Sequence, residues 1–166
     1  MHGRGMVEMG RKEITADLLH RLEQHVNPKN DPRVYTAREV TFDYATKHKT
    51  RVDYMRFKPL NNSVSGIEKG DVYCYEIKSS VADYRSGHGL NFLGDYNYLV
   101  MPKDVFGELQ NEIPWYVGVL VPEDDGLRSV RNAKRRDREK PLTEILLMMY
   151  RSTLRELKKQ QNKEEK

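Results

Sequence analysis

A carboxylate and an ammonium stand two residues apart in the segment Glu76-Ile77-Lys78, which ends a run of residues typical of a β-strand. Side chains on a strand alternate between its two faces, so Glu76 and Lys78 project on the same side. A second strand candidate upstream, residues 51–57, carries Asp53. If Asp53 meets this pair at one edge of a sheet, a cation site forms with a lysine beside it. That combination is the chemistry of a metal-dependent phosphodiester hydrolase.

Each of these groups has a definite role in such a site. Mg²⁺ and Mn²⁺ prefer carboxylate and carbonyl oxygens, so Asp53, Glu76 and the backbone carbonyl of Ile77 are the candidate metal ligands. A bound divalent ion polarises a phosphoryl oxygen and lowers the pKa of a bound water. Lys78 would then orient that water or stabilise the developing negative charge.

A simpler reading is also open, because a Glu and a Lys at this spacing are common on exposed strands as a surface ion pair. The neighbouring residues favour a site instead. The strand around Glu76 consists mostly of Val, Tyr, Cys and Ile, and Asp53 has Val52, Tyr54 and Met55 beside it. Charged side chains in such apolar strands are costly unless they are paired or bind a ligand.

Size and composition fit one domain spanning residues 1–166, since 166 residues can bury a sizeable core. Hydrophobic residues make up 37% and charged residues 33% of the chain. No apolar run is long enough to cross a membrane, and no signal peptide is present. Cys74 is the single cysteine, which excludes an intrachain disulfide and a cysteine-rich zinc site. We therefore expect a cytoplasmic protein.

Hydrophobic periodicity predicts a mixed α/β fold. Apolar residues at helical spacing predict a helix over residues 11–26, and the Asn-Pro-rich segment after it ends that helix. Strands are predicted over 33–44, 52–57, 71–78, 97–101 and 115–121, with a loop over 61–70 and helices near 80–85, 103–111 and 141–157. Residues 1–10 and 158–166 are expected to be loose. This order indicates a mixed sheet flanked by helices.

The spacing of the candidate site resembles that of a known nuclease superfamily. Asp53 precedes Glu76-Ile77-Lys78 by 23 residues, as in the PD-(D/E)XK, or restriction-endonuclease-like, superfamily. The usual proline of that motif is Val52 here. The segments 76–85 and 95–102 further resemble the MmcB-like group of DNA-repair-related proteins and their phage relatives. The resemblance extends over residues 33–157.

The resemblance implies an α-β-β-β-α-β core and a deoxyribonuclease that uses Mg²⁺ or Mn²⁺, acting in DNA repair, recombination or phage DNA metabolism. It implies that Asp53 and Glu76 are metal ligands and that Lys78 is the catalytic lysine. The alternative is a catalytically silent DNA-binding or protein-binding module on the same fold.

Three further residues are candidates for the site. Many members of the superfamily add an acidic residue from the first helix, which points to Glu13, and Glu39 on the first strand is its rival. A solvated position for Glu13 and a structural ion pair for Glu39 are the alternatives. His88 lies in a glycine-rich loop after the Lys78 strand and could contact phosphate or transfer a proton, or be a plain loop residue.

A basic run precedes the last predicted helix. The chain has a formal net charge of +4, and much of the excess gathers around Arg131, Lys134, Arg135 and Arg136. Such clusters attract phosphate backbones, so these residues are predicted to contact DNA; a solvated charged face is the alternative. The apolar stripe of the helix over 141–157 is assigned to the core, with a homodimer seam as the alternative.

Overall fold

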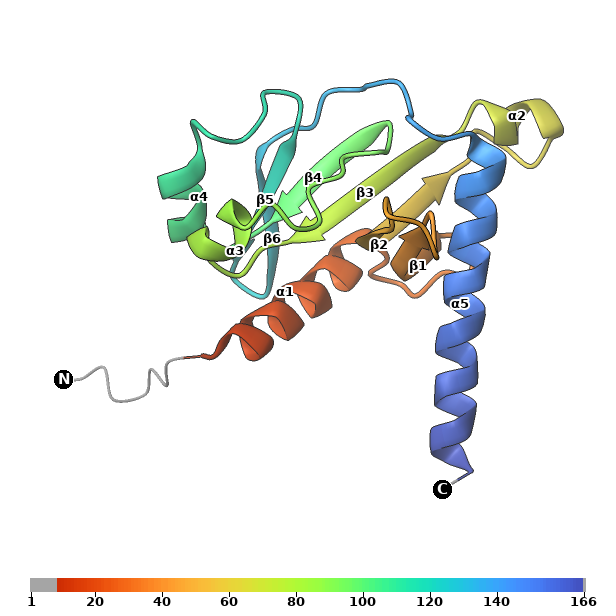
Figure 1. Cartoon of the computed structure of the whole chain (residues 1–166), viewed down its shortest axis with the longest axis horizontal. Helices are drawn as coiled ribbons and strands as arrows, with labels where there is room; N and C mark the ends of the chain where they lie inside the picture. Colours follow the sequence, from red (N-terminus) through yellow and green to blue (C-terminus); the bar gives the residue numbers. More distant parts are fainter. Residues whose placement is uncertain (1–8, 166) are drawn as a thin grey trace.

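The computed structural model describes residues 9–165 and contains a six-stranded mixed sheet flanked by helices (Figure 1). The elements in chain order are α1 (Arg11–Val26), β1 (Tyr35–Phe42), β2 (Thr50–Lys58), α2 (Val64–Glu68), β3 (Asp71–Ile77), α3 (Val81–Arg85), β4 (Tyr96–Val100), α4 (Lys103–Leu109), β5 (Gly118–Glu123), β6 (Gly126–Arg131) and α5 (Leu142–Glu164). The predicted α/β class is confirmed.

The strands lie in the sheet in the order in which they follow one another along the chain, β1 to β6. β1 and β2 form an antiparallel hairpin, and β2 pairs antiparallel with β3. β3, β4 and β5 are parallel, and β6 returns antiparallel to β5. α3 and α4 provide the crossovers that parallel strands require.

Helices cover both faces of the sheet. Leu18, Leu22 and Val26 of α1 pack on one face in a cluster with residues of β2 to β5. On the other face, α5 covers β1, β2 and part of β3, whereas α3 and α4 cover β4 and β5. The helical stripe predicted over residues 11–26 is therefore the contact face of α1, and it brings the first turn of α1 to the end of β3.

Three expectations about individual elements are wrong. The predicted loop over 61–70 contains α2, which begins where the Ser63 side chain accepts a hydrogen bond from the Gly66 amide. β6 lies where no strand was predicted, between the strand expected over 115–121 and the last helix. Residues 158–164 are not loose but continue α5. Of the segment 1–10, residues 1–8 lie outside the described part of the chain, and Gly10 is the N-cap of α1.

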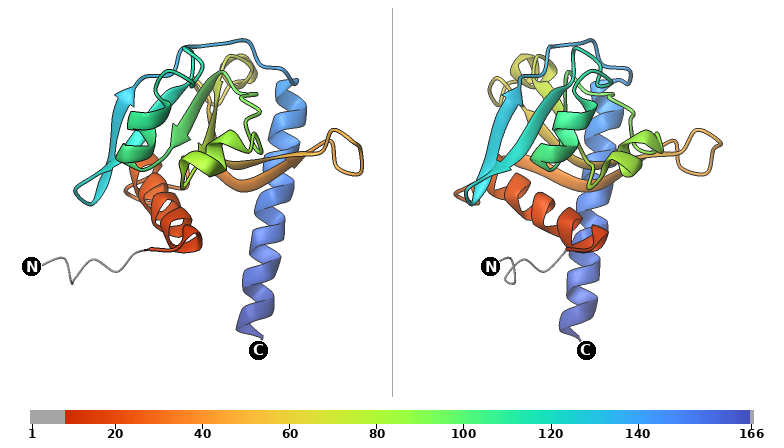
Figure 2. Two further views of the ribbon diagram at one scale, coloured as in Figure 1. Left: turned by 60° about the vertical axis from the view of Figure 1, so that its left-hand side comes forward. Right: turned by 90° about the vertical axis from the view of Figure 1, so that its left-hand side faces the viewer.

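The second half of α5 extends beyond the sheet (Figures 1 and 2). Ile145 and Met149 of its first half are buried, as the predicted core stripe requires, but Leu154 and Leu157 of the same stripe are exposed, so the core assignment is wrong for them because they lie beyond the sheet. Leu147, Tyr150, Leu154 and Leu157 are exposed in the single chain. A homodimer through this helix stays a prediction. Among the described residues, no helix is long and apolar enough to cross a membrane.

Candidate active site

The candidate site forms where β2 and β3 separate. Their antiparallel pairing ends at Tyr54 opposite Tyr75, although β2 continues back to Thr50 along β1. One step beyond that last pair, the same register places Asp53 opposite Glu76. The two strands therefore leave a gap, which we call the fork, at the point where the Asp53 and Glu76 carboxylates meet.

The Asp53 carboxylate closes part of this gap. Its Oδ2 accepts a hydrogen bond from the Ile77 amide at 2.8 Å, in place of the β2 carbonyl that a continuing ladder would supply. The contact fixes the orientation of Asp53 beside Glu76. Asp53, Glu76 and Ile77 all line the cavity at this point.

Glu76 is buried and incompletely satisfied. The residue is 3% exposed, and its Oε1 atom has no hydrogen-bond partner among residues 9–165. Burial raises the pKa of Glu76 well above its usual range, and the Asp53 carboxylate raises it further, whereas the Lys78 ammonium opposes the shift. A buried carboxylate of this kind is costly unless something binds it. A divalent cation would supply the missing partner.

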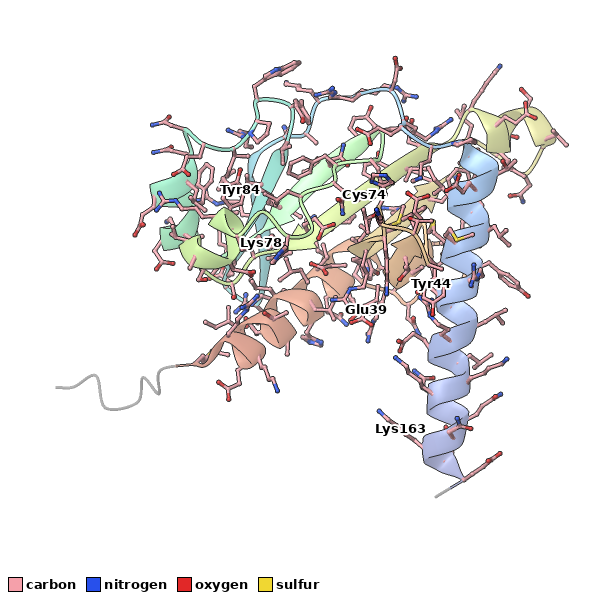
Figure 3. All side chains as sticks on the ribbon, in the orientation of Figure 1. Glu39, Tyr44, Cys74, Lys78, Tyr84 and Lys163 are labelled. Atoms are coloured by element: carbon pink, nitrogen blue, oxygen red, sulfur yellow. The ribbon has the colours of Figure 1, made fainter. Side chains whose placement is uncertain are left out.

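Lys78 follows β3 directly, and its backbone amide donates to the Val100 carbonyl at 2.9 Å. The side chain is 6% exposed, and its Nζ donates to the His88 carbonyl. Nζ also lies 3.9 Å from Oδ1 of Asp83. Figure 3 shows Lys78 at the end of β3 beside α3, so the lysine enters the site from the strand that carries Glu76.

Asp83 on α3 was not among the predicted site residues. Its carboxylate accepts hydrogen bonds from the Ser79 amide at 3.1 Å and from Arg11 at 2.8 Å. Its own amide donates to Ser80 Oγ, which caps α3. Asp83 lies in the segment 76–85 that carries the family resemblance, but neither that resemblance nor a helix cap reveals what the carboxylate contacts.

The loop after α3 approaches the carboxylates closely at Gly89. A Cβ atom there would lie 3.0 Å from Glu76 Oε2 and 3.7 Å from Lys78 Nζ. Gly89 has a φ of +77°, a conformation that residues with side chains rarely adopt. Glycine therefore keeps the space beside Glu76 open.

These side chains line a cavity of about 1020 Å³. The cavity lies where β2 and β3 separate. α1 borders it on one face of the sheet, and the loop after α3 borders it on the other. Four cationic residues on its wall form what we call the cationic rim. The rim consists of Arg11 and Lys12 of α1, Lys49 of the β1–β2 hairpin and Arg51 of β2, and all four are exposed. Figure 2 shows the hairpin projecting from the body of the protein.

The site is suited to a hard divalent cation. Among residues 9–165, no three His, Cys, Asp or Glu side chains gather to form a metal-binding cluster. Two carboxylates nevertheless suit Mg²⁺, which usually keeps several waters and takes further oxygens from substrate phosphates. The unpartnered Oε1 of Glu76 and the space left by Gly89 fit this kind of coordination.

The structure does not bring Glu13 or Glu39 into the cavity. Glu13 accepts a hydrogen bond from the Gly10 amide and closes the capping box of α1. Glu39 lies opposite Asp53 in the β1–β2 register, but it has a φ of +49° and its side chain is exposed. Figure 3 shows it away from Lys78, between α1 and α5. His88 does line the cavity, and its backbone carbonyl, rather than its ring, contacts Lys78.

The basic run predicted to bind DNA, residues 131–136, lies near the start of β3, at the opposite end from Lys78. Arg131 donates to backbone carbonyls that include those of Val117 and Pro114, so it holds a loop in place. Arg135 pairs with Asp71 at the start of β3. Arg136 lies over the Tyr116 ring, and Lys134 is exposed. Within this run, Lys134 and Arg136 are thus the residues still suited to contacting a phosphate backbone.

Comparisons with known proteins were made for the whole chain. A scan against models of protein families gave no match, and a search of curated proteins found no relative. Among solved structures, the chain is similar to the SPO1766 protein of unknown function from Silicibacter pomeroyi, with a TM-score of 0.61 and 17% sequence identity. The match covers 95% of this chain and 96% of that chain. At this identity the similarity concerns the fold alone.

Proposed function

We propose that this protein is a metal-dependent nuclease that hydrolyses phosphodiester bonds in DNA. The observation that carries the proposal is the meeting of two carboxylates, Asp53 and Glu76, with the buried Lys78 ammonium at the fork between β2 and β3. This is also the arrangement that the resemblance to PD-(D/E)XK nucleases implies. The fold alone would not distinguish a nuclease from other α/β proteins.

In this proposal Asp53 and Glu76, with the Ile77 carbonyl, hold Mg²⁺ or Mn²⁺. The bound ion supplies Lewis-acid activation of the phosphate and a more acidic water. Lys78 orients the attacking water and stabilises the negative charge that develops on the phosphoryl oxygens. A P–O bond to the water oxygen would form while the P–O bond to the leaving sugar oxygen breaks. The attacking water gives up one proton to solvent and the leaving oxygen takes one up, so each cleavage consumes one water.

The cationic rim supplies the electrostatic part of substrate binding. Its four positive charges line the same cavity as the carboxylates. They would offset the repulsion between these carboxylates and the phosphates of DNA. Lysine and arginine side chains that neutralise phosphates release counterions, so affinity should fall steeply with salt concentration.

The direct test is incubation of the purified protein with labelled single-stranded, duplex and branched DNA. We expect cleavage of at least one of these substrates with Mg²⁺ or Mn²⁺ and none with EDTA. An Asp53→Ala variant should lose both cleavage and Mn²⁺ binding. Asp104→Ala, which changes an exposed aspartate of α4 outside the cavity, is the matched control. Metal-independent cleavage, or cleavage that survives Asp53→Ala, would refute the proposal.

A further inference from the structure

We infer that Asp83 is a positioning residue that fixes the Lys78 ammonium, and that Arg11 of α1 in turn fixes Asp83. This inference rests on the proposed function for its catalytic meaning. Its structural content is a chain of contacts from α1 through α3 to the end of β3. No sequence motif singles out Arg11, and the resemblance of segment 76–85 to known proteins gives Asp83 no role.

Lys78 needs such a partner because its side chain is long and flexible. A lysine ammonium on a four-carbon stem has many rotamers, and ordering it costs conformational entropy. Here the ammonium is buried, donates to the His88 carbonyl and has Asp83 Oδ1 at 3.9 Å. The hydrogen bond to His88 and the charge of Asp83 therefore hold the ammonium from the α3 side, in the cavity that Asp53 and Glu76 also line.

Asp83 is itself held from several directions. Oδ2 accepts from the Ser79 amide at 3.1 Å and from Ser79 Oγ at 3.4 Å. Oδ1, the oxygen nearest Lys78, accepts from Arg11 at 2.8 Å. Its side chain is 9% exposed. A carboxylate with this many donors has little freedom, so it can define the position of Lys78.

Arg11 connects this arrangement to the cationic rim. Its side chain is 74% exposed, whereas that of Asp83 is nearly buried, so the guanidinium lies at the mouth of the cavity. A DNA phosphate that reaches the rim would meet the same guanidinium that holds Asp83. Arg11 is thus the rim residue that would both contact the substrate and, through Asp83, help to position Lys78.

A double-mutant cycle distinguishes positioning of Lys78 from a general structural role. Asp83→Asn keeps the size of the side chain and an oxygen for the Ser79 amide but removes the charge. We expect it to slow single-turnover DNA cleavage about 10- to 100-fold, the scale of a misplaced catalytic group. In a Lys78→Ala background, Asp83→Asn should cause no further loss. Additive losses would overturn the inference.

Two further variants complete the cycle. Arg11→Gln should also slow cleavage, by a smaller factor, and should add nothing to Asp83→Asn at saturating DNA. Asp104→Asn changes a carboxylate in the first turn of another short helix outside the cavity and should have no effect. Mn²⁺ affinity should be unchanged in Asp83→Asn, because Asp83 is not a ligand in this account; loss of Mn²⁺ binding would overturn its assignment as a positioning residue.

A readout that does not need activity separates this inference from the proposed function. A lysine ammonium held by acceptors should give a resolved side-chain ¹H–¹⁵N signal at low temperature, assigned by its absence in Lys78→Ala. Asp83→Asn should broaden or remove that signal, and an unchanged signal would overturn the inference. If the wild-type protein cleaves no DNA, the proposed function fails, and this signal alone decides the positioning role.

Discussion

The Asp53 carboxylate accepts a hydrogen bond from the Ile77 amide at 2.8 Å, one step beyond the last pair between β2 and β3. A side chain thereby takes the place of a backbone acceptor where the two strands separate. The contact fixes Asp53 beside Glu76, whose buried Oε1 has no hydrogen-bond partner in the described part of the chain. The pairing between β2 and β3 ends at this point, and the two carboxylates come together where it ends.

Glu76→Gln should stabilise the metal-free protein, and the gain should depend on pH. Burial and the Asp53 carboxylate raise the pKa of Glu76 above its ordinary value of 4.5. Between that value and the higher folded-state pKa, the folded protein binds more protons than the unfolded chain. Its stability therefore falls as pH rises through this interval, and glutamine removes the loss.

Urea denaturation in EDTA from pH 4.5 to 8 checks this expectation. The free-energy difference between Glu76→Gln and wild type should grow with pH and level off above the folded-state pKa of Glu76. A gain of about 1–3 kcal/mol at the plateau is the scale of an unsatisfied buried polar group. A difference that does not change with pH would contradict the raised pKa.

Metal binding should release a proton and should tighten as pH rises. The carboxylate form of Glu76 is the ligand, and burial with Asp53 nearby keeps part of it protonated below its raised pKa. Mn²⁺ titration by calorimetry in two buffers of different ionisation enthalpy measures the proton count. The release should disappear in Glu76→Gln together with most of the affinity, and binding without proton release in wild type would argue against Glu76 as a ligand.

Gly89→Ala should block the site, and Gly87→Ala should not. Both glycines have a φ of +77°, so alanine at either position costs about 1–2 kcal/mol of stability. A Cβ at Gly89 would lie 3.0 Å from Glu76 Oε2, whereas nothing lies within 4 Å of one at Gly87. We expect similar losses of unfolding free energy but loss of Mn²⁺ affinity in Gly89→Ala alone. Equal Mn²⁺ affinities would show that the space beside Glu76 is not used.

Charge reversal should distinguish the two cationic surfaces. Lys12→Glu with Arg51→Glu changes the cationic rim, and Lys134→Glu with Arg136→Glu makes the same change of charge in the basic run at the other end of β3. The rim pair should lower DNA affinity and reduce the slope of log affinity against log salt by about two. The measurement is fluorescence anisotropy with labelled DNA in Ca²⁺. A larger effect from Lys134 and Arg136 would place the main DNA contact on the basic run.

Much of the fold follows from local patterns in the sequence. α1 was predicted with its observed bounds because its apolar residues recur at helical spacing and an Asn-Pro turn ends it. The approach of Asp53 to Glu76 was expected from the apolar residues around both and from a spacing that resembles the PD-(D/E)XK motif. The continuation of α5 was missed because a Lys-, Glu- and Gln-rich segment was interpreted as a frayed helix end or a tail, although these residues are good helix formers.

The surroundings of the site could not be predicted in this way. The fork depends on where the β2–β3 pairing stops, which is a property of two strands and not of either segment. The cationic rim combines α1 with the β1–β2 hairpin, so its members are far apart in sequence. The run around Arg131 was conspicuous in sequence, yet Arg131 itself is engaged by loop carbonyls. Clustering along the chain does not show which charges have partners.

Single-turnover cleavage of labelled DNA by wild type and Lys78→Ala tests the central claim most directly. Lys103→Ala, which changes an exposed lysine of α4 outside the cavity, serves as the matched control. We predict metal-dependent cleavage by wild type and Lys103→Ala and a loss of about 100-fold or more in Lys78→Ala, the scale of removing a group that stabilises transition-state charge. Equal rates for wild type and Lys78→Ala would contradict the account.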